Sequence, residues 1–340
     1  MPSCQENSKS FFEKLQKAKG LDLRDNRGKR HDLAVVLVGV TLAVLSNRDG
    51  NLSSLQRHLK NHYGKLVKVL EIKKKHAVSR SQLPLILEKV ACEVFDRLIF
   101  ESFGINLSKQ ERKWFALDGK ELRGSISQGN KRGEAVVQAV AHDNCQTVAQ
   151  DYYAGEKESE VPLVRKIFKE SGLASQKTSF DALHCKPLTL SIVSAGGGKY
   201  LVGLKDNQKE LKKQITRAMA DQSILFTTAG QEKSHGRIER RRYEFYDVLE
   251  MTKADRWNTC RIKTAIKVSR DRVEIKSGKT GCEESYYLTN ETGNYEALAQ
   301  AVRNHWAVET NNHMRDVSFR EDQMRSKKRV YKEQRQESGL

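Results

Sequence analysis

Paired cysteines and long apolar runs are both missing from this sequence. The six cysteines include no C-x-x-C pair, which argues against a zinc ribbon and against a secreted disulfide scaffold. The run LAVVLVGVTLAVL at 33–45 is well short of the roughly 20 residues that a membrane-spanning helix needs. It also begins too far along the chain for a signal peptide. We therefore expect a cytoplasmic protein with reduced thiols and no membrane association.

An excess of acidic residues is missing as well. The chain has 43 Asp and Glu against 61 Lys and Arg, for a formal net charge of +18. Such a surface attracts phosphate backbones, because each neutralised phosphate releases its condensed counterions. Solubility alone would also explain a basic surface. For a chain of this size and charge we favour a nucleic-acid partner.

Hydrophobic periodicity changes along the chain. Residues 1–106 carry apolar residues at helical spacing, which predicts a helical N-terminal domain. From 107 to 326 the pattern gives the order β, β, β, α, β, α, β, α, which predicts an α/β fold with a mixed sheet and covering helices. A β-rich segment at about 230–290 interrupts that pattern. A helix of about 20 residues follows it, and 327–340 form a charged tail.

Two aspartates follow apolar strand patterns. Asp118 ends WFALD and Asp181 ends TSFD, so each carboxylate is expected at the edge of the sheet, a usual place for catalytic groups in α/β folds. A plain Asp-Gly turn is the alternative for Asp118. Together the two aspartates have the oxygen ligands that Mg²⁺ prefers.

Glu309 belongs to the predicted helix before the tail. Leu298, Val302 and Trp306 form an apolar stripe at i, i+4 spacing, and Glu309 returns to nearly the same face two turns after Val302. A carboxylate on a buried face is costly unless it is paired or bound to a metal, so both an ion pair and a metal site remain open. His305 is expected on the same face, but His-Glu-His at this spacing matches no standard zinc motif.

A basic segment, HGRIERRRYEF at 235–245, interleaves arginines with aromatics. Arginine next to aromatic side chains is suited to contacts with a DNA backbone or an unstacked base, although an ordinary exposed basic strand is equally compatible. Its arginines are candidates for DNA binding: Arg237, Arg240, Arg241 and Arg242.

Several motifs in a fixed order resemble the DDE-type insertion-sequence transposases, and within them the H-repeat-associated transposase family. The matching segments are ALDGKELRGS, EKESEVPLV, SFDALHCKPLT, KYLVGLKDNQKEL, HGRIERRRYEF, SYYLTN and RNHWAVETNNHMRDVSFREDQMR. The resemblance covers about residues 10 to 326. It implies a ribonuclease H-like mixed-sheet core with a β-rich insertion and an associated helical N-terminal domain.

The same resemblance implies a catalytic site. Its three carboxylates fall on Asp118, Asp181 and Glu309, which would bind two Mg²⁺ (or Mn²⁺) ions for cutting and joining DNA. The implied partner is double-stranded DNA, both element ends and target, held by a homodimer on paired ends in a prokaryotic cytosol. Further DNA-binding candidates are Lys120, Arg123, Lys205 and His305.

Two departures from the wider transposase pattern bear on activity. The tyrosine, arginine and lysine that accompany the catalytic glutamate in that group are replaced here by Val302, His305 and Asp316. After FRED the sequence turns into SKKRVYKEQRQESGL, where the family continues with an apolar helix. We expect impaired activity from this C-terminus. A catalytically silent DNA-binding protein and a metal-dependent nuclease are the alternative functions.

Overall fold

The computed structural model describes residues 4–47, 51–73, 76–103, 107, 112–126, 132–153, 157–234, 236–252 and 256–323. Contacts between residues divide the chain into two units. One unit comprises 1–106 with 122–134 and 312–340, and the other comprises 107–121 with 135–311. The predicted domain boundary near residue 106 lies outside the described residues.

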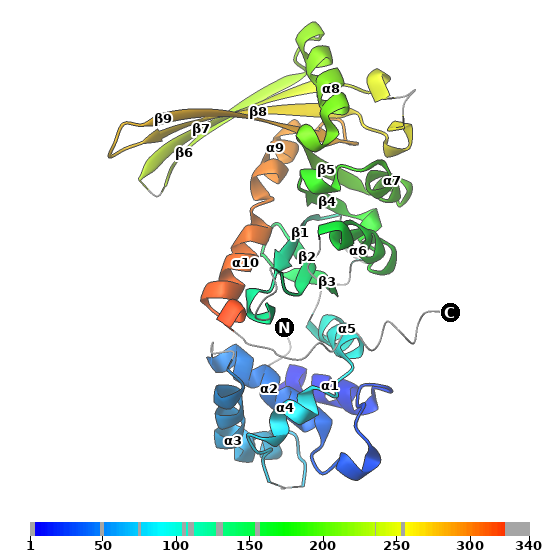
Figure 1. The fold of residues 1–340 in the computed structure, drawn as a ribbon, viewed down its shortest axis with the longest axis vertical. Coiled ribbons are helices and arrows are strands. Elements are labelled where there is room, and N and C mark those ends of the chain that lie inside the picture. Colours follow the sequence, from blue (N-terminus) through cyan, green and yellow to red (C-terminus); the bar gives the residue numbers. More distant parts are fainter. Residues whose placement is uncertain are drawn as a thin grey trace. The chain divides into compact units, whose positions relative to one another are not determined.

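Five helices make up the N-terminal region of the first unit (Figure 1). They are α1 (Cys4–Lys17), α2 (Leu33–Asn47), α3 (Leu52–Val69), α4 (Gln82–Leu87) and α5 (Cys92–Phe103). Asp32 starts α2, because its Oδ1 accepts a hydrogen bond of 2.8 Å from the amide of Ala34. The first part of α2, from Leu33 to Val38, is buried in a core shared with the other helices, which explains the start of the apolar run at 33–45, whereas Val44 and Leu45 at its end are exposed.

A nine-stranded mixed sheet forms the second unit, in the order β3-β2-β1-β4-β5-β9-β8-β7-β6. Its strands are β1 (Trp114–Glu121), β2 (Ala135–Ala141), β3 (Thr147–Tyr153), β4 (Lys177–Phe180), β5 (Lys199–Leu204), β6 (Phe226–Ser234), β7 (Arg237–Asp247), β8 (Thr264–Glu274) and β9 (Thr280–Thr289). Strand β4 pairs in parallel with β1 and β5, and the other neighbours are antiparallel. The predicted mixed α/β fold is confirmed.

Helices connect and cover the sheet in the predicted order. They are α6 (Lys157–Glu170), α7 (Pro187–Ala195), α8 (Lys209–Asp221), α9 (Tyr295–Asn304) and α10 (Ala307–Val317). Helix α6 packs on β2 and β3, α7 packs on β5, and α9 packs on β5 and β6. None of the helices in the described part of the chain combines the length and apolarity needed to cross a bilayer.

The β-rich segment continues the main sheet instead of forming a separate one. Strand β9 pairs with β5, and β8, β7 and β6 follow outward, so that these long strands project beyond the rest of the sheet as an arm (Figure 1). At its base, Tyr243 and Phe245 of β7 pack with Leu298 of α9. The arm is therefore anchored by the helix that immediately follows it in sequence.

The predicted helix of about 20 residues is wrong, because it is two helices. Helix α9 ends at Asn304 and α10 begins at Ala307. The supposed apolar stripe breaks at the same point: Leu298 is buried, whereas the Trp306 side chain is 51% exposed. The helical face inferred for Glu309 from Val302 is therefore also wrong.

Candidate active site

Asp118 lies in β1, and Asp181 directly follows the neighbouring strand β4. The last parallel pair between β1 and β4 is Leu117 with Phe180, and each aspartate is the next residue along the chain. Strand β1 continues past this point, with Asp118 opposite Gln138 of β2. The Asp-Gly turn is thereby excluded for Asp118. The parallel register brings the two predicted carboxylates to one edge of the β1–β4 ladder.

The electrostatics of Asp118 show how closely the acids are gathered. Burial raises the pKa of Asp118 from its usual 3.8 to about 7, and the negative charges of Asp181 and Glu160 act in the same direction. The backbone amide of Gly119 and the nearby His184 act against this increase. Asp118 therefore keeps its proton to a higher pH than an ordinary aspartate does.

Asp181 is held by the turn that it starts. Its Oδ1 accepts a hydrogen bond of 2.9 Å from the amide of Leu183, which caps the short helix η4 (Ala182–His184). The residue is exposed, in contrast to Asp118. One carboxylate of the pair is therefore accessible, and the other lies deeper in the sheet.

Glu160 is a third carboxylate at this place, and the sequence did not reveal it. It lies in the first part of α6 with 7% exposure, and its Oε1 is 2.9 Å from Nε2 of His184. Its Oε2 accepts a hydrogen bond of 3.0 Å from the hydroxyl of Tyr153. Glutamates just before or at the start of a helix are ordinarily solvated, and the buried His184 in the turn after Asp181 explains why this one is not.

Gly119 makes room for that carboxylate. A Cβ at this position would lie 2.5 Å from Oε2 of Glu160 and 3.0 Å from the hydroxyl oxygen of Tyr153. Only a residue without a side chain lets the Glu160 carboxylate approach β1 so closely next to Asp118. The packing of α6 on the sheet therefore accounts for the glycine directly after Asp118.

Glu309 is exposed in the first turn of α10, contrary to the buried face expected for it. The two residues before it, Ala307 and Val308, are buried against Ala116 of β1 and Val140 of β2. Glu309 thus follows a segment packed on the strand that carries Asp118. The main groups that shift the pKa of Asp118 are Asp181, Glu160, Gly119 and His184, besides burial.

His305 has a different environment from the one predicted. Its Nδ1 lies 2.9 Å from Oγ of Ser179, and the same Oγ lies 2.8 Å from Nε2 of His142. Burial lowers the pKa of His305 to about 4 and that of His142 to about 3. Both imidazoles are therefore neutral at pH 7, which disfavours a charged phosphate contact through His305.

This pair of neutral histidines should make the protein sensitive to acid. Because both pKa values are lower in the folded chain than the usual 6.5, unfolding takes up protons, and stability is lost as the pH falls below about 6.5. Between pH 6.5 and 5 we expect His142→Gln to lose about 2 kcal/mol less stability than the wild type, measured by urea unfolding. The exposed His313→Gln is the control and should follow the wild type; equal losses in all three proteins would contradict the prediction.

The donor set at Asp118 and Asp181 fits a divalent cation. The negative charges of Asp118 and Asp181 repel each other, and Glu160 adds a third carboxylate close by. A bound cation would relieve this repulsion. Among the described residues, no group of three His, Cys, Asp or Glu side chains is already arranged as a metal site, and the His-Glu-His zinc alternative gains no support. Asp118 and Asp181 are thus two of the three predicted ligands brought together.

Comparison with known protein families identifies the family of this chain. The profile of the transposase DDE domain matches residues 109–335, which is most of the chain. The chain belongs to the transposase DDE domain family. Members of this family have the ribonuclease H-like fold class in general, and the mixed sheet is compatible with it.

Individual relatives are distant. The chain is 26% identical over 223 residues to "H repeat-associated putative transposase YhhI" of Escherichia coli K12, and equally so to "Putative protein YbfL" of the same strain. These alignments cover 63% of this chain and only 59% of either relative. An uncharacterized protein in the dhlA 3′ region of Xanthobacter autotrophicus is 26% identical over 291 residues, or 84% of this chain and 95% of that protein.

The predicted DNA contacts of this DDE-family chain near the acids differ in exposure. Lys120 lies two residues beyond Asp118 and is 8% exposed, so its side chain is mostly shielded from solvent. Lys205 directly follows β5 and is exposed. Arg123 is also exposed, but its backbone amide and side chain face Asp322, with the amide 3.2 Å from Oδ1. Lys205 and Arg123 are thus exposed, whereas Lys120 is not.

The four arginines of strand β7 do not form one surface. Neighbouring residues of a strand point to opposite faces. Arg237 and Arg241 therefore share the face of the buried Phe245, whereas Arg240 and Arg242 lie on the other face, where both are exposed. A single DNA duplex lying on one face of the arm would meet only one of these pairs.

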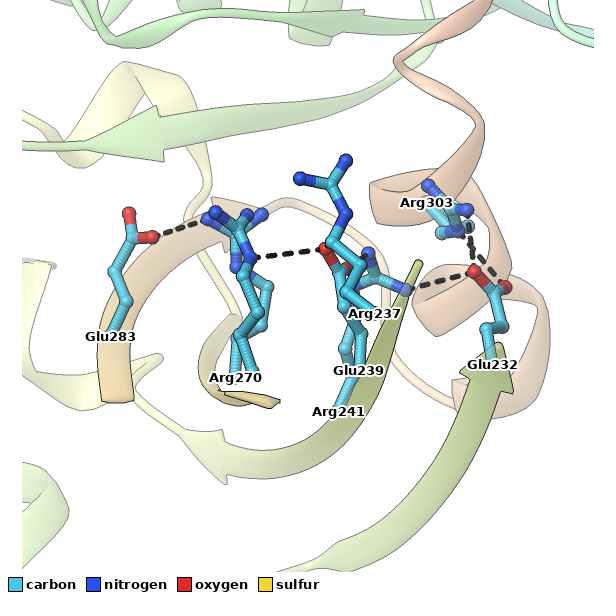
Figure 2. Close-up of polar contacts among 8 residues, drawn as sticks. Glu232, Arg237, Glu239, Arg241, Arg270, Glu283 and Arg303 are labelled. Carbon is cyan, nitrogen blue, oxygen red and sulfur yellow. Dashed lines mark hydrogen bonds and ion pairs between the residues drawn. The ribbon is translucent and has the colours of Figure 1, made fainter. Parts of the chain in front are cut away.

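On the Phe245 face the arginines are engaged with carboxylates. Glu239, which is 6% exposed, forms ion pairs with Arg237, Arg241 and Arg272 (Figure 2). Further ion pairs join Glu232 to Arg241 and Arg303, and Glu283 to Arg270. Such a network stiffens the arm. It also neutralises the positive charges of Arg237 and Arg241, two of the four arginines predicted to bind DNA.

Proposed function

We propose that this chain is a DNA transposase that cuts the ends of an insertion element and joins them to target DNA. The observation that carries the proposal is the pair Asp118 and Asp181, each directly after the last parallel pair of β1 and β4, where burial and then the charge of Asp181 raise the pKa of Asp118. Membership of the DDE family supports the same function. The first relatives are matched over only 59% of their length, so the activity of this chain does not follow from theirs.

The residues that would hold Mg²⁺ (or Mn²⁺) are Asp118, Asp181 and Glu309. When bound, divalent ions in such a site activate the attacking hydroxyl and stabilise the leaving oxygen of a phosphodiester. The packing of Ala307 and Val308 on β1 supports the inclusion of Glu309, because it anchors the start of α10 near the strand of Asp118. The exposed Asp181 is on the accessible side, where a DNA phosphate would approach.

Double-stranded DNA is the proposed partner, both as element ends and as target. A homodimer on paired ends and a cytoplasmic location remain predictions from the sequence. The basic balance of the chain suits an acidic site of this kind, since positive charge elsewhere holds a polyanion near carboxylates that would otherwise repel it.

The test is metal-dependent cleavage of DNA that carries the element's own terminal repeats. With Mg²⁺ or Mn²⁺ we expect the wild type to cut, and Asp118→Asn, Asp181→Asn and Glu309→Gln each to cut about 10³-fold more slowly, because each loses a ligand that supports transition-state charge. Binding of the same DNA in EDTA should change little. Asp206→Asn, a substitution of an exposed aspartate, is the matched control.

The outcomes separate the candidate functions. Equal cleavage by all variants would refute the assignment of the three carboxylates. DNA binding without cleavage by any protein would favour a silent DNA-binding descendant. Cleavage without transfer of the 3′ ends to target DNA would favour a nuclease.

A further inference from the structure

Helix α3 has a composition unlike that of the other helices. Its 18 residues, LSSLQRHLKNHYGKLVKV, contain four Lys and Arg residues and no carboxylate. In α8 acidic and basic residues occur together, and Lys213 pairs with Glu210 one turn away. Helix α3 has no such partner within its own sequence.

The four cations lie on one side of α3. At 100° per residue, Arg57, Lys60, Lys65 and Lys68 fall within one exposed sector of the helix. The opposite side carries the buried residues Leu55, Leu59 and Leu66, which pack in the helical core. The orientation of α3 is thus fixed by its apolar side, and the cationic side faces solvent.

These cations have no ionic partner in the part of the chain that the structure describes. No carboxylate there lies within ion-pair distance of Arg57, Lys60, Lys65 or Lys68, in contrast to Lys113, Lys166 and Lys212 of the sheet unit. Like charges one turn apart repel each other along a helix. An anionic partner from outside the chain would relieve this repulsion.

Gly64 lies at the centre of the same sector, next to Asn61. A Cβ at position 64 would meet no atom within 4 Å, and Gly64 has no positive φ. Neither packing nor backbone conformation among the described residues therefore requires a glycine here, although glycine disfavours a helix interior. A partner that approaches the helix backbone closely would explain it.

From these observations we infer that α3 is a DNA-docking helix, whose exposed sector of Arg57, Lys60, Gly64, Lys65 and Lys68 lies against the phosphate backbone of a duplex. The sector from Arg57 to Lys68 is about 16 Å long, and the major groove, about 12 Å wide, admits an α-helix. No large apolar side chain is exposed in the described sector from Arg57 to Lys68, although Leu52 at the start of α3 is 43% exposed, and a sector without exposed apolar side chains disfavours a membrane surface. The choice of DNA as the polyanion rests on the proposed function.

The test measures the affinity of the full chain for duplex DNA in EDTA over a series of salt concentrations. One variant changes Arg57, Lys60, Lys65 and Lys68 to Gln. A second changes Lys113, Lys166, Lys212 and Lys213 to Gln, which lowers the net charge equally but removes cations that are already paired. We expect the first variant to bind on the order of 10²- to 10³-fold more weakly at about 0.1 M salt, with the salt slope reduced by about 3–4. The second should lose less than about tenfold.

Single substitutions at Gly64 provide a check that does not weaken the fold. Gly64→Ala should raise Tm by about 1–3 °C, because alanine favours the helix and the position is open. Gly64→Glu should fold equally well but bind DNA at least about tenfold more weakly, because a carboxylate would face the phosphates. Circular dichroism at the assay temperature verifies folding of every variant.

Equal DNA affinity in the two fourfold variants would overturn the inference. So would a loss confined to RNA binding or to capture of an acidic protein, with DNA binding intact. Failure of the proposed function appears separately, as absence of metal-dependent cleavage by a wild type whose binding in EDTA still depends on α3.

Discussion

Asp118→Asn should make the protein markedly more stable at pH 8 while slowing the proposed DNA cleavage about 10³-fold. In the wild type, ionising Asp118 is opposed first by burial and then by the charges of Asp181 and Glu160, which raise its pKa to about 7. Unfolding releases the carboxyl into water, where its pKa is the usual 3.8. The amide keeps the shape of the side chain without the charge. We expect the free energy of unfolding to increase by up to about 4 kcal/mol.

The pH dependence of this gain has a definite sign. Between pH 3.8 and about 7 the folded chain holds a proton on Asp118 that the unfolded chain has released, so wild-type stability falls as the pH rises through this window. Urea unfolding at pH values of about 4.5, 6 and 8 should therefore show a difference between variant and wild type that grows with pH. A variant no more stable than the wild type at the highest pH would mean that Asp118 is not destabilising when charged.

Two comparisons complete the experiment. Asp206→Asn removes an exposed aspartate paired with Lys212 and should change stability by less than about 1 kcal/mol. Adding Mn²⁺ at about 100 times its dissociation constant should stabilise the wild type by about 2.7 kcal/mol and the Asp118→Asn variant much less. The same carboxylate would then destabilise the free protein and hold the metal ion.

The positions of Asp118 and Asp181 next to each other could be predicted because the sequence pattern that indicates them is local. Each follows an apolar strand pattern, and parallel strands place such residues at one edge of a sheet. The separation of the β7 arginines onto two faces is also available from the sequence, since residues of a strand alternate with a period of two. Composition alone, with arginines next to aromatics, does not reveal that separation.

The surroundings of Glu309 were not predictable in the same way. The segment Asn304-His305-Trp306-Ala307 contains no proline or glycine to mark the end of a helix. Instead the break coincides with contacts from distant parts of the chain, namely the bond of His305 to Ser179 and the packing of Val308 on β1. Tertiary contacts thus override helical propensity here.

Glu160 depends even more on distant partners. Its burial requires Gly119 on β1, Tyr153 on β3 and His184 after β4, none of which belongs to α6 itself. A run of glutamates before a helix carries no sign of this arrangement. Buried residues that hold the site residues in place through contacts with distant segments are therefore the hardest to predict from a single sequence.

Gly119→Ala should disrupt the site more than its small change in volume suggests. The new Cβ would lie 2.5 Å from Oε2 and 2.6 Å from Cδ of Glu160, so the carboxylate must move. Because that carboxylate is buried and bonded to His184 and Tyr153, displacing it leaves buried polar groups without partners. We expect a loss of about 2–4 kcal/mol in the free energy of unfolding. Mn²⁺ affinity should fall about 10- to 100-fold, because groups that orient metal ligands have effects of this size.

A double-mutant cycle with Glu160→Ala identifies the cause. If the clash with the carboxylate is the origin, Gly119→Ala should cost less than about 1 kcal/mol once Glu160 is replaced by alanine, since its Cβ then meets mainly the Tyr153 hydroxyl. Gly230→Ala, in strand β6 with nothing within 4 Å, is the matched control and should be nearly neutral. Costs that simply add, with Gly119→Ala equally damaging in both backgrounds, would show that Gly119 serves the strand and not Glu160. A small cost in the second background would instead show that Gly119 makes room for the Glu160 carboxylate.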